Sequence, residues 1–104
     1  MLFHVTMTHT EDNCAAYHHE LMPAVLDAFE NLETLGKDLN VKLHFFTWCP
    51  PEHVAFALLE ADELSAISRF VFSIPMLQKT DIVPVEHMRD AMPMLRAMAA
   101  PTQD

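Results

Sequence analysis

The sequence has one glycine and one tryptophan among its 104 residues, and six lysines and arginines against 15 aspartates and glutamates. No glycine-rich loop is present to cradle a nucleotide phosphate, and neither a nucleophile elbow nor a paired CxxC motif occurs. Nucleotide hydrolysis, serine hydrolysis and thioredoxin-like redox chemistry therefore have no support. Because the formal net charge is -9, the chain would repel a phosphate backbone, and we expect no nucleic-acid partner.

Long apolar runs are also missing. No stretch approaches the roughly 20 apolar residues that span a bilayer, and the start of the chain lacks a basic segment followed by a long apolar one. We therefore expect no membrane partner and a cytoplasmic location. In a reducing compartment, Cys14 and Cys49 are expected to be free thiols or metal ligands rather than a disulfide. With 51% hydrophobic residues, residues 1–104 are expected to form a single domain with its own core.

The stretch Leu2 to His9 is the clearest strand, because its apolar and polar side chains alternate. One face carries Phe3, Val5 and Met7, and the other carries His4, Thr6 and Thr8. We expect the first face to pack on the core, and the polar face either to be solvated or to line a pocket. Such a strand is typically central in a small sheet.

The remaining elements follow from hydrophobic periodicity and from turn residues. The patterns predict a helix over 23–35, strands over 41–48 and 53–60 in a hairpin, a helix between 62 and 74, a strand over 81–86 and a helical segment over 86–100. The segment 14–21 is either a loop or a separate helical turn.

Single residues mark several of these boundaries. Gly36 is placed to end the first helix in a left-handed conformation, and Asp62 is placed to cap the second helix. Pro84 indicates an edge strand or a bulge, and Pro93 should kink or restart the last helix. The tail from Pro101 is expected to fray.

The order strand, helix, strand, strand, helix, strand, with a helical C-terminal addition, predicts an α+β, ferredoxin-like βαββαβ domain. Both helices then pack on one face of an antiparallel sheet and leave the other face uncovered. We expect large apolar side chains on that open face, namely Phe46, Trp48, Val54, Phe56 and Leu58. A homodimer or higher oligomer would cover them, and the methionine-rich C-terminal segment is expected to help.

The opening Met1-Leu2-Phe3-His4-Val5, followed by Met7, resembles that of muconolactone isomerases, which belong to the dimeric α+β-barrel superfamily. The stretches 57–62 and 81–85 resemble strand ends in uncharacterised bacterial members. The resemblance implies two four-stranded sheets that face each other across a dimer, with a cavity between sheet and helices or inside the barrel. Members of the superfamily include isomerases, small monooxygenases, haem-handling enzymes and proteins with no known reaction, so the fold alone decides little.

One candidate site lies on the open face of the predicted sheet. His4 and Glu60 are predicted as an acid/base pair, since burial would raise the pKa of the Glu60 carboxyl. A ligand or cofactor in this cavity is expected to touch Thr6, His44, Trp48 and Phe56. Two imidazoles and a carboxylate could instead hold a divalent metal. The plainer alternative is that these histidines are ordinary half-buried side chains and that Glu60 is solvated.

A second candidate site follows the first strand, where His9, Cys14 and His18 occur close together, next to His19. If 14–19 is helical, Cys14 and His18 lie one turn apart and can chelate a divalent or soft transition metal, with His9 as a third ligand. The alternative is a histidine-rich surface loop. Cys49 and His53 have the same separation, but the two intervening prolines prevent a helical turn, so this pair is not proposed as a site.

The methionines near the C-terminus are expected to pack in a core or an interface rather than to bind copper(I). The sequence therefore predicts a protein that binds a small molecule or a metal ion beside its first strand. The alternatives are a cofactor-independent isomerase or small monooxygenase acting on a cyclic or conjugated substrate, and a structural assembly subunit without a ligand.

Overall fold

The computed structural model describes residues 1–101, so most of the predicted frayed tail, residues 102–104, lies outside the described residues. The strands are β1 (Leu2–Thr8), β2 (Lys42–Cys49), β3 (Val54–Glu60) and β4 (Lys79–Val85). The helices are α1 (Met22–Glu30), α2 (Leu32–Asp38), α3 (Leu64–Phe72) and α4 (Met88–Ala99). Short 3-10 turns are η1 (Glu11–Asn13), η2 (Ala15–Tyr17) and η3 (Pro50–Glu52).

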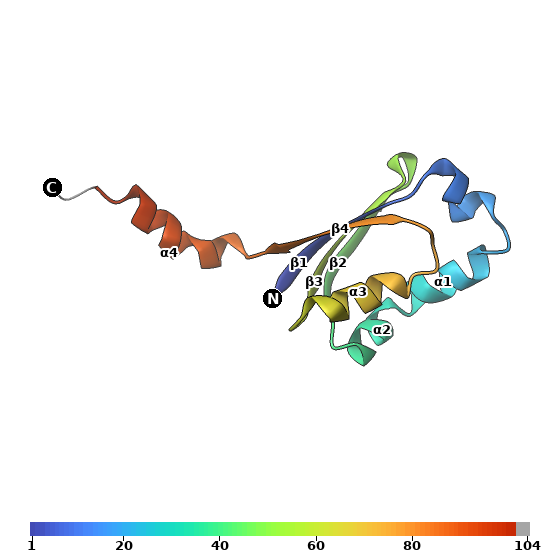
Figure 1. Cartoon of the computed structure of the whole chain (residues 1–104), viewed down its shortest axis with the longest axis horizontal. Coiled ribbons are helices and arrows are strands. Elements are labelled where there is room, and N and C mark those ends of the chain that lie inside the picture. Colours follow the sequence, from blue (N-terminus) through green and yellow to red (C-terminus); the bar gives the residue numbers. More distant parts are fainter. Residues whose placement is uncertain (102–104) are drawn as a thin grey trace.

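The four strands form one antiparallel sheet in the order β2-β3-β1-β4. Helices α1, α2 and α3 lie on the same side of this sheet, as Figure 1 shows. The predicted ferredoxin-like α+β fold is thereby confirmed. β1 is central, as its patterning predicts, and β4 is an edge strand that accommodates Pro84.

The core lies between the helices and one face of the sheet. Alternation along β1 buries Phe3, Val5 and Met7, each at most 3% exposed. They pack in one cluster with Ile67 and Phe70 of α3. The hydrophobic periodicity of strand and helix therefore meets at one interface, and this burial is the main stabilisation of the domain.

The predicted helix over 23–35 is two helices that meet at Asn31. The Asn31 side chain donates to the backbone oxygen of Asp27 at 2.8 Å, and the Asn31 backbone has φ -111° and ψ 19°. A side chain that competes for backbone groups favours such a break.

Gly36 does not end a helix in a left-handed conformation, so this prediction is wrong. It lies inside α2, and the left-handed residue beyond the helix is Asn40, at φ 57°. Glycine is required at position 36 for space, because a Cβ there would lie 2.6 Å from the backbone oxygen of Val41. The predicted cap of α3 is also displaced by one residue, from Asp62 to Glu63.

A β-bulge in β2 changes which side chains face the helices. The register with β3 shifts between Leu43 and Phe45, so His44 is the extra residue. Phe46 consequently contacts Phe29 of α1, with ring centroids 5.8 Å apart. Phe46 and Trp48 lie on the helix side, and their predicted place on the open face is wrong.

Helix α4 extends away from the sheet beyond the end of β4 (Figure 1). The principal extents of the chain are 68 × 30 × 18 Å. Pro93 lies inside this continuous helix rather than at a restart. Within one chain α4 does not cover the open face as expected. Within residues 1–101, no helix is both long and apolar enough to cross a bilayer.

Candidate functional site

Two imidazoles meet where β1 ends and β3 begins. Antiparallel pairing of these strands aligns Thr8 with Val54, which brings His9 beside His53. The backbone N–H of His9 donates to the backbone oxygen of His53 at 3.2 Å. Their side chains also meet, with His9 Nε2 and His53 Nδ1 3.2 Å apart. The sheet itself therefore holds this pair.

Cys14 completes the group. It lies between η1 and η2, where its backbone N–H donates to Glu11 and its oxygen accepts from Tyr17. Its side chain is buried. The Sγ of Cys14 and one ring nitrogen each of His9 and His53 all lie within 4.8 Å of one another. We call these three residues the His-Cys-His cluster.

Burial shapes the electrostatics of the His-Cys-His cluster. The pKa of His9 is lowered first by burial and second by the neighbouring charge on His53. Both effects disfavour the protonated imidazole. A neutral imidazole has a free lone pair that can accept a proton or bind a metal.

An apolar cavity of about 390 Å³ opens beside this cluster, between the sheet and α1. Its apolar walls come from Val25, Leu26 and Phe29 of α1 and from Phe46, Trp48 and Ala55 of the sheet. His9, Cys14 and Gln78 add the polar groups. Among the described residues, the Gln78 Nε2 is buried without a hydrogen-bond partner. An apolar cavity with a few polar groups is the usual form of a small-ligand site.

The open face carries a different pair at its other end. His44 Nε2 and Glu60 Oε1 lie 2.8 Å apart, with the two side chains 30% and 47% exposed. The hydrogen bond from His44 lowers the pKa of Glu60, and the positive charges of His44, Lys42 and the N-terminus add to this. Desolvation acts in the opposite direction but is a smaller effect than the hydrogen bond, so the expectation of a raised pKa for Glu60 is wrong.

These arrangements can be set beside known proteins. Residues 1–99 match the family described as a domain of unknown function, DUF3303. The chain belongs to the DUF3303 family. It is also similar in structure to crystalline muconolactone isomerase, with a TM-score of 0.59 and 16% identity over 84% of this chain and 91% of that one. At this identity the likeness shows the fold. No curated protein matches the chain.

In this DUF3303 domain the two sequence-predicted sites have different outcomes. His9 and Cys14 come together as the pattern favours, but His18 does not join them. The His18 ring instead contacts the backbone oxygen of Asp12 and lies 3.5 Å from the Glu20 carboxylate.

The third member of the His-Cys-His cluster, His53, is a residue that sequence reasoning missed. Its spacing from Cys49 suggests only a helical turn, which the two prolines prevent, whereas its partner His9 lies at the end of the neighbouring strand β1. The expected topology could have identified His53, because antiparallel pairing of the first and third strands brings the end of one to the start of the other.

On the open face of this DUF3303 domain, His4 and Glu60 are not in contact through any hydrogen bond. Their ladder positions differ, since His4 pairs with Leu58 whereas Glu60 pairs with Leu2. The His4 ring lies 6.1 Å from that of Phe56, which itself pairs with Thr6. The catalytic and ligand-binding roles of these residues stay predictions.

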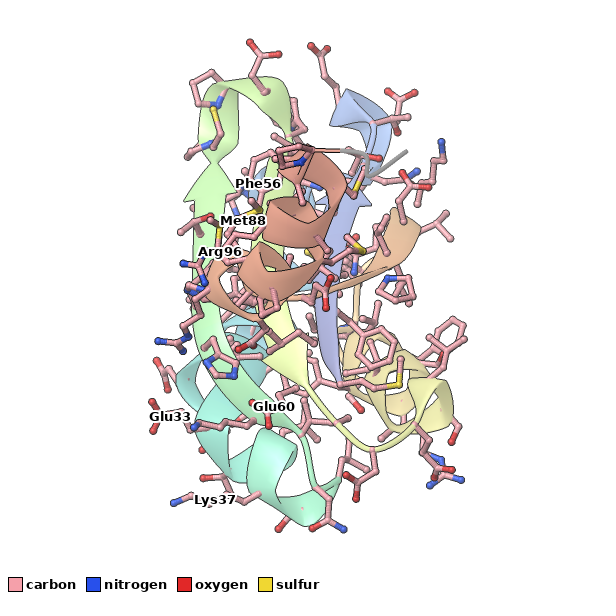
Figure 2. All side chains as sticks on the ribbon, turned by 90° about the vertical axis from the view of Figure 1, so that its left-hand side faces the viewer. Glu33, Lys37, Phe56, Glu60, Met88 and Arg96 are labelled. Carbon is pink, nitrogen blue, oxygen red and sulfur yellow. The ribbon has the colours of Figure 1, made fainter. Side chains whose placement is uncertain are left out.

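Glu60 lies at the end of the molecule where α2 carries Glu33 and Lys37, as Figure 2 shows. These three side chains, with residues 40–43 and 61–62, line a hollow of about 490 Å³. The hollow is rich in charged groups of both signs. Because these groups are solvated, the hollow does not provide the water-excluding surface that a small apolar ligand needs.

Proposed function

We propose that this DUF3303 domain binds a small, mostly apolar molecule in the cavity between the sheet and α1. The observation that carries the proposal is the cavity itself, whose volume of about 390 Å³ lies in the range of small-ligand sites. The polar end of the ligand would meet His9, Cys14 and Gln78. The unpaired Gln78 Nε2 is a donor that a ligand oxygen would satisfy.

The ligand class follows from these walls. Aromatic side chains Phe29, Phe46 and Trp48 favour a flat cyclic or conjugated body. One oxygen function, a carbonyl or a carboxylate, would match the polar end. This class agrees with the cyclic or conjugated substrate expected from the sequence.

Trp48 supplies the experiment, because it is the single tryptophan and lines the cavity. Titration with a panel of aromatic ketones and carboxylates should change its fluorescence saturably, and calorimetry should give a matching affinity. Ala55→Phe fills the cavity and should abolish binding. Thr47→Phe adds the same ring to the opposite face of the sheet and should leave binding unchanged. Equal binding by the wild type and by Ala55→Phe would contradict the proposal.

Proton transfer on the bound molecule is the alternative. The fold is shared with an isomerase, and the His9 imidazole, when no metal is bound to it, lies at the polar end of the cavity where it could accept a proton from the bound molecule. Exchange of an activated C–H proton of a bound ketone for deuterium, followed by NMR, tests this. His9→Gln should stop the exchange while binding persists. Exchange that His9→Gln leaves unchanged excludes His9 as the base.

The open face supports a proposal of self-association. Phe45 is 40% exposed and Val83 is 54% exposed on this face, and α4 exposes Met94 and Met98 beyond it. Exposed apolar side chains of this kind are typical of interfaces. A second copy of the chain would cover the open face and the exposed methionines of α4, as the fold class predicts. A structural assembly subunit would associate in the same way without any ligand.

Sedimentation measurements test the self-association. Phe45→Lys and Val83→Lys should shift the protein toward monomer, while Glu33→Lys on α2 should not. A wild-type protein that stays monomeric at high micromolar concentration would exclude the dimer.

A further inference from the structure

We infer that the His-Cys-His cluster of His9, Cys14 and His53 binds one transition-metal ion of intermediate softness, such as Zn²⁺. This goes beyond the proposed ligand binding and does not depend on it. The sequence groups His18 with His9 and Cys14 as candidate ligands, whereas the structure brings His53 to His9 and Cys14 instead.

The spacing of the donor atoms supports the inference. Zinc binds imidazole nitrogen at about 2.0–2.1 Å, so two such nitrogens in a tetrahedral site lie about 3.3 Å apart. His9 Nε2 and His53 Nδ1 lie 3.2 Å apart. The Cys14 Sγ and one ring nitrogen of each histidine lie within 4.8 Å of one another. In a tetrahedral zinc site sulfur and nitrogen ligands lie about 3.6 Å apart, so the Sγ would move by at most about 1.2 Å to reach the ion.

The chemistry of the donors narrows the ion. Two imidazoles and one thiolate suit zinc and its neighbours in the first transition row, whereas magnesium and calcium require oxygen ligands. The Cys14 side chain is buried, and a bound cation would pair with its thiolate.

The fold holds the ligands in place without the metal. His9 and His53 are joined through the backbone at 3.2 Å, and the β1–β3 ladder fixes their separation. His53 has a left-handed backbone at φ 52°, which is uncommon for a residue with a side chain. The ordering of two ligands is thus already supplied by the sheet.

Three protein ligands leave one position of a tetrahedral ion free. His9 and Cys14 belong both to the cluster and to the lining of the cavity. An ion held by them would therefore border the cavity, where its free position is open to water or to an oxygen of a bound molecule.

The test uses the untagged full chain, stripped with a chelator and titrated with Zn²⁺ by calorimetry. One equivalent should bind. Loss of a ligand should weaken binding at least as much as loss of an outer-shell partner, by roughly 100-fold. Co²⁺ should give the absorption of a tetrahedral ion with a thiolate ligand. Cys14→Ser should bind the ion more weakly, and its Co²⁺ complex should lack the absorption band that arises from a thiolate ligand.

His53→Asn is the decisive variant, since asparagine tolerates the left-handed backbone while the imidazole is lost. His18→Gln is its matched control, because His18 lies on the same loop as Cys14 but outside the cluster. Thermal unfolding of the metal-free proteins checks that each variant folds. We expect His53→Asn to lose Zn²⁺ and His18→Gln to keep it.

Two results would overturn the inference. In one, folded wild-type protein binds no stoichiometric Zn²⁺ or Co²⁺, so the two imidazoles share only a hydrogen bond. In the other, His18→Gln loses the ion while His53→Asn retains it. Neither result bears on ligand binding in the Ala55→Phe experiment, so the two proposals fail separately.

Discussion

The two faces of the sheet carry similar chemical groups under opposite conditions. The helix-covered face ends in the half-buried His9 and the buried Cys14, which lie beside an apolar cavity. The open face ends in His44 and Glu60, which meet in water. Histidine occurs at both places, so residue type does not distinguish them. Burial does, because it changes the charge state and the value of each contact.

The largest expected difference between the faces is in core packing. Leu58 and Leu59 are neighbours on β3, and Leu59 is 0% exposed whereas Leu58 is half-buried on the open face. Leu59→Ala should lower the free energy of unfolding by about 2–5 kcal/mol. Leu58→Ala should lower it much less in the monomer. Urea denaturation of both variants measures the difference.

Protein concentration sharpens this comparison. If a second copy covers the open face, the loss in Leu58→Ala should grow with concentration, while the loss in Leu59→Ala persists at high dilution. If both variants lost the same free energy of unfolding in dilute, monomeric protein, Leu58 and Leu59 would be equally buried, which would contradict the structure.

A smaller effect is expected at Gly36, which is buried within α2. A Cβ at this position would lie 2.6 Å from the Val41 backbone oxygen, and that atom belongs to the chain entering β2. Gly36→Ala should lower the free energy of unfolding by about 1–3 kcal/mol, the usual cost of overpacking. Thermal unfolding measures it.

The exposed Asn40 offers a contrast with Gly36. It has a positive φ of 57°, so Asn40→Gly should be neutral or stabilising. A neutral Gly36→Ala would contradict the close approach of the Val41 backbone oxygen, and a destabilising Asn40→Gly would contradict the left-handed backbone at Asn40.

Predictions that depend only on neighbouring residues along the chain are confirmed. The alternation in β1 depends only on the strand period, and it identified Phe3, Val5 and Met7 as core residues. Pro84 likewise required an edge strand through its missing N–H. These features are local, so the sequence alone was sufficient to predict them.

Features that depend on pairing were not recoverable in the same way. The bulge at His44 follows from the register with β3, and no local pattern marks it, so Phe46 and Trp48 were assigned to the wrong face. The partner of His9 is His53, 44 residues away. The two prolines before His53 exclude a local helix but give no indication that His53 pairs with His9.

The smallest expected effect concerns the solvated pair on the open face. The hydrogen bond from His44 is the main cause of the lowered Glu60 pKa, so His44→Ala should return this pKa toward its ordinary value, as an NMR titration of the carboxyl carbon would show. Because the folded-state pKa is the lower one, the pair stabilises the fold above the unfolded-state pKa of Glu60. That contribution is lost as pH falls through the folded-state value.

The stability difference between wild type and His44→Ala should therefore be present at neutral pH and vanish in acid. Lys42→Ala removes a lesser cause and should move the pKa less. A larger shift in Lys42→Ala than in His44→Ala would mean that long-range charge, rather than the hydrogen bond, controls this carboxylate.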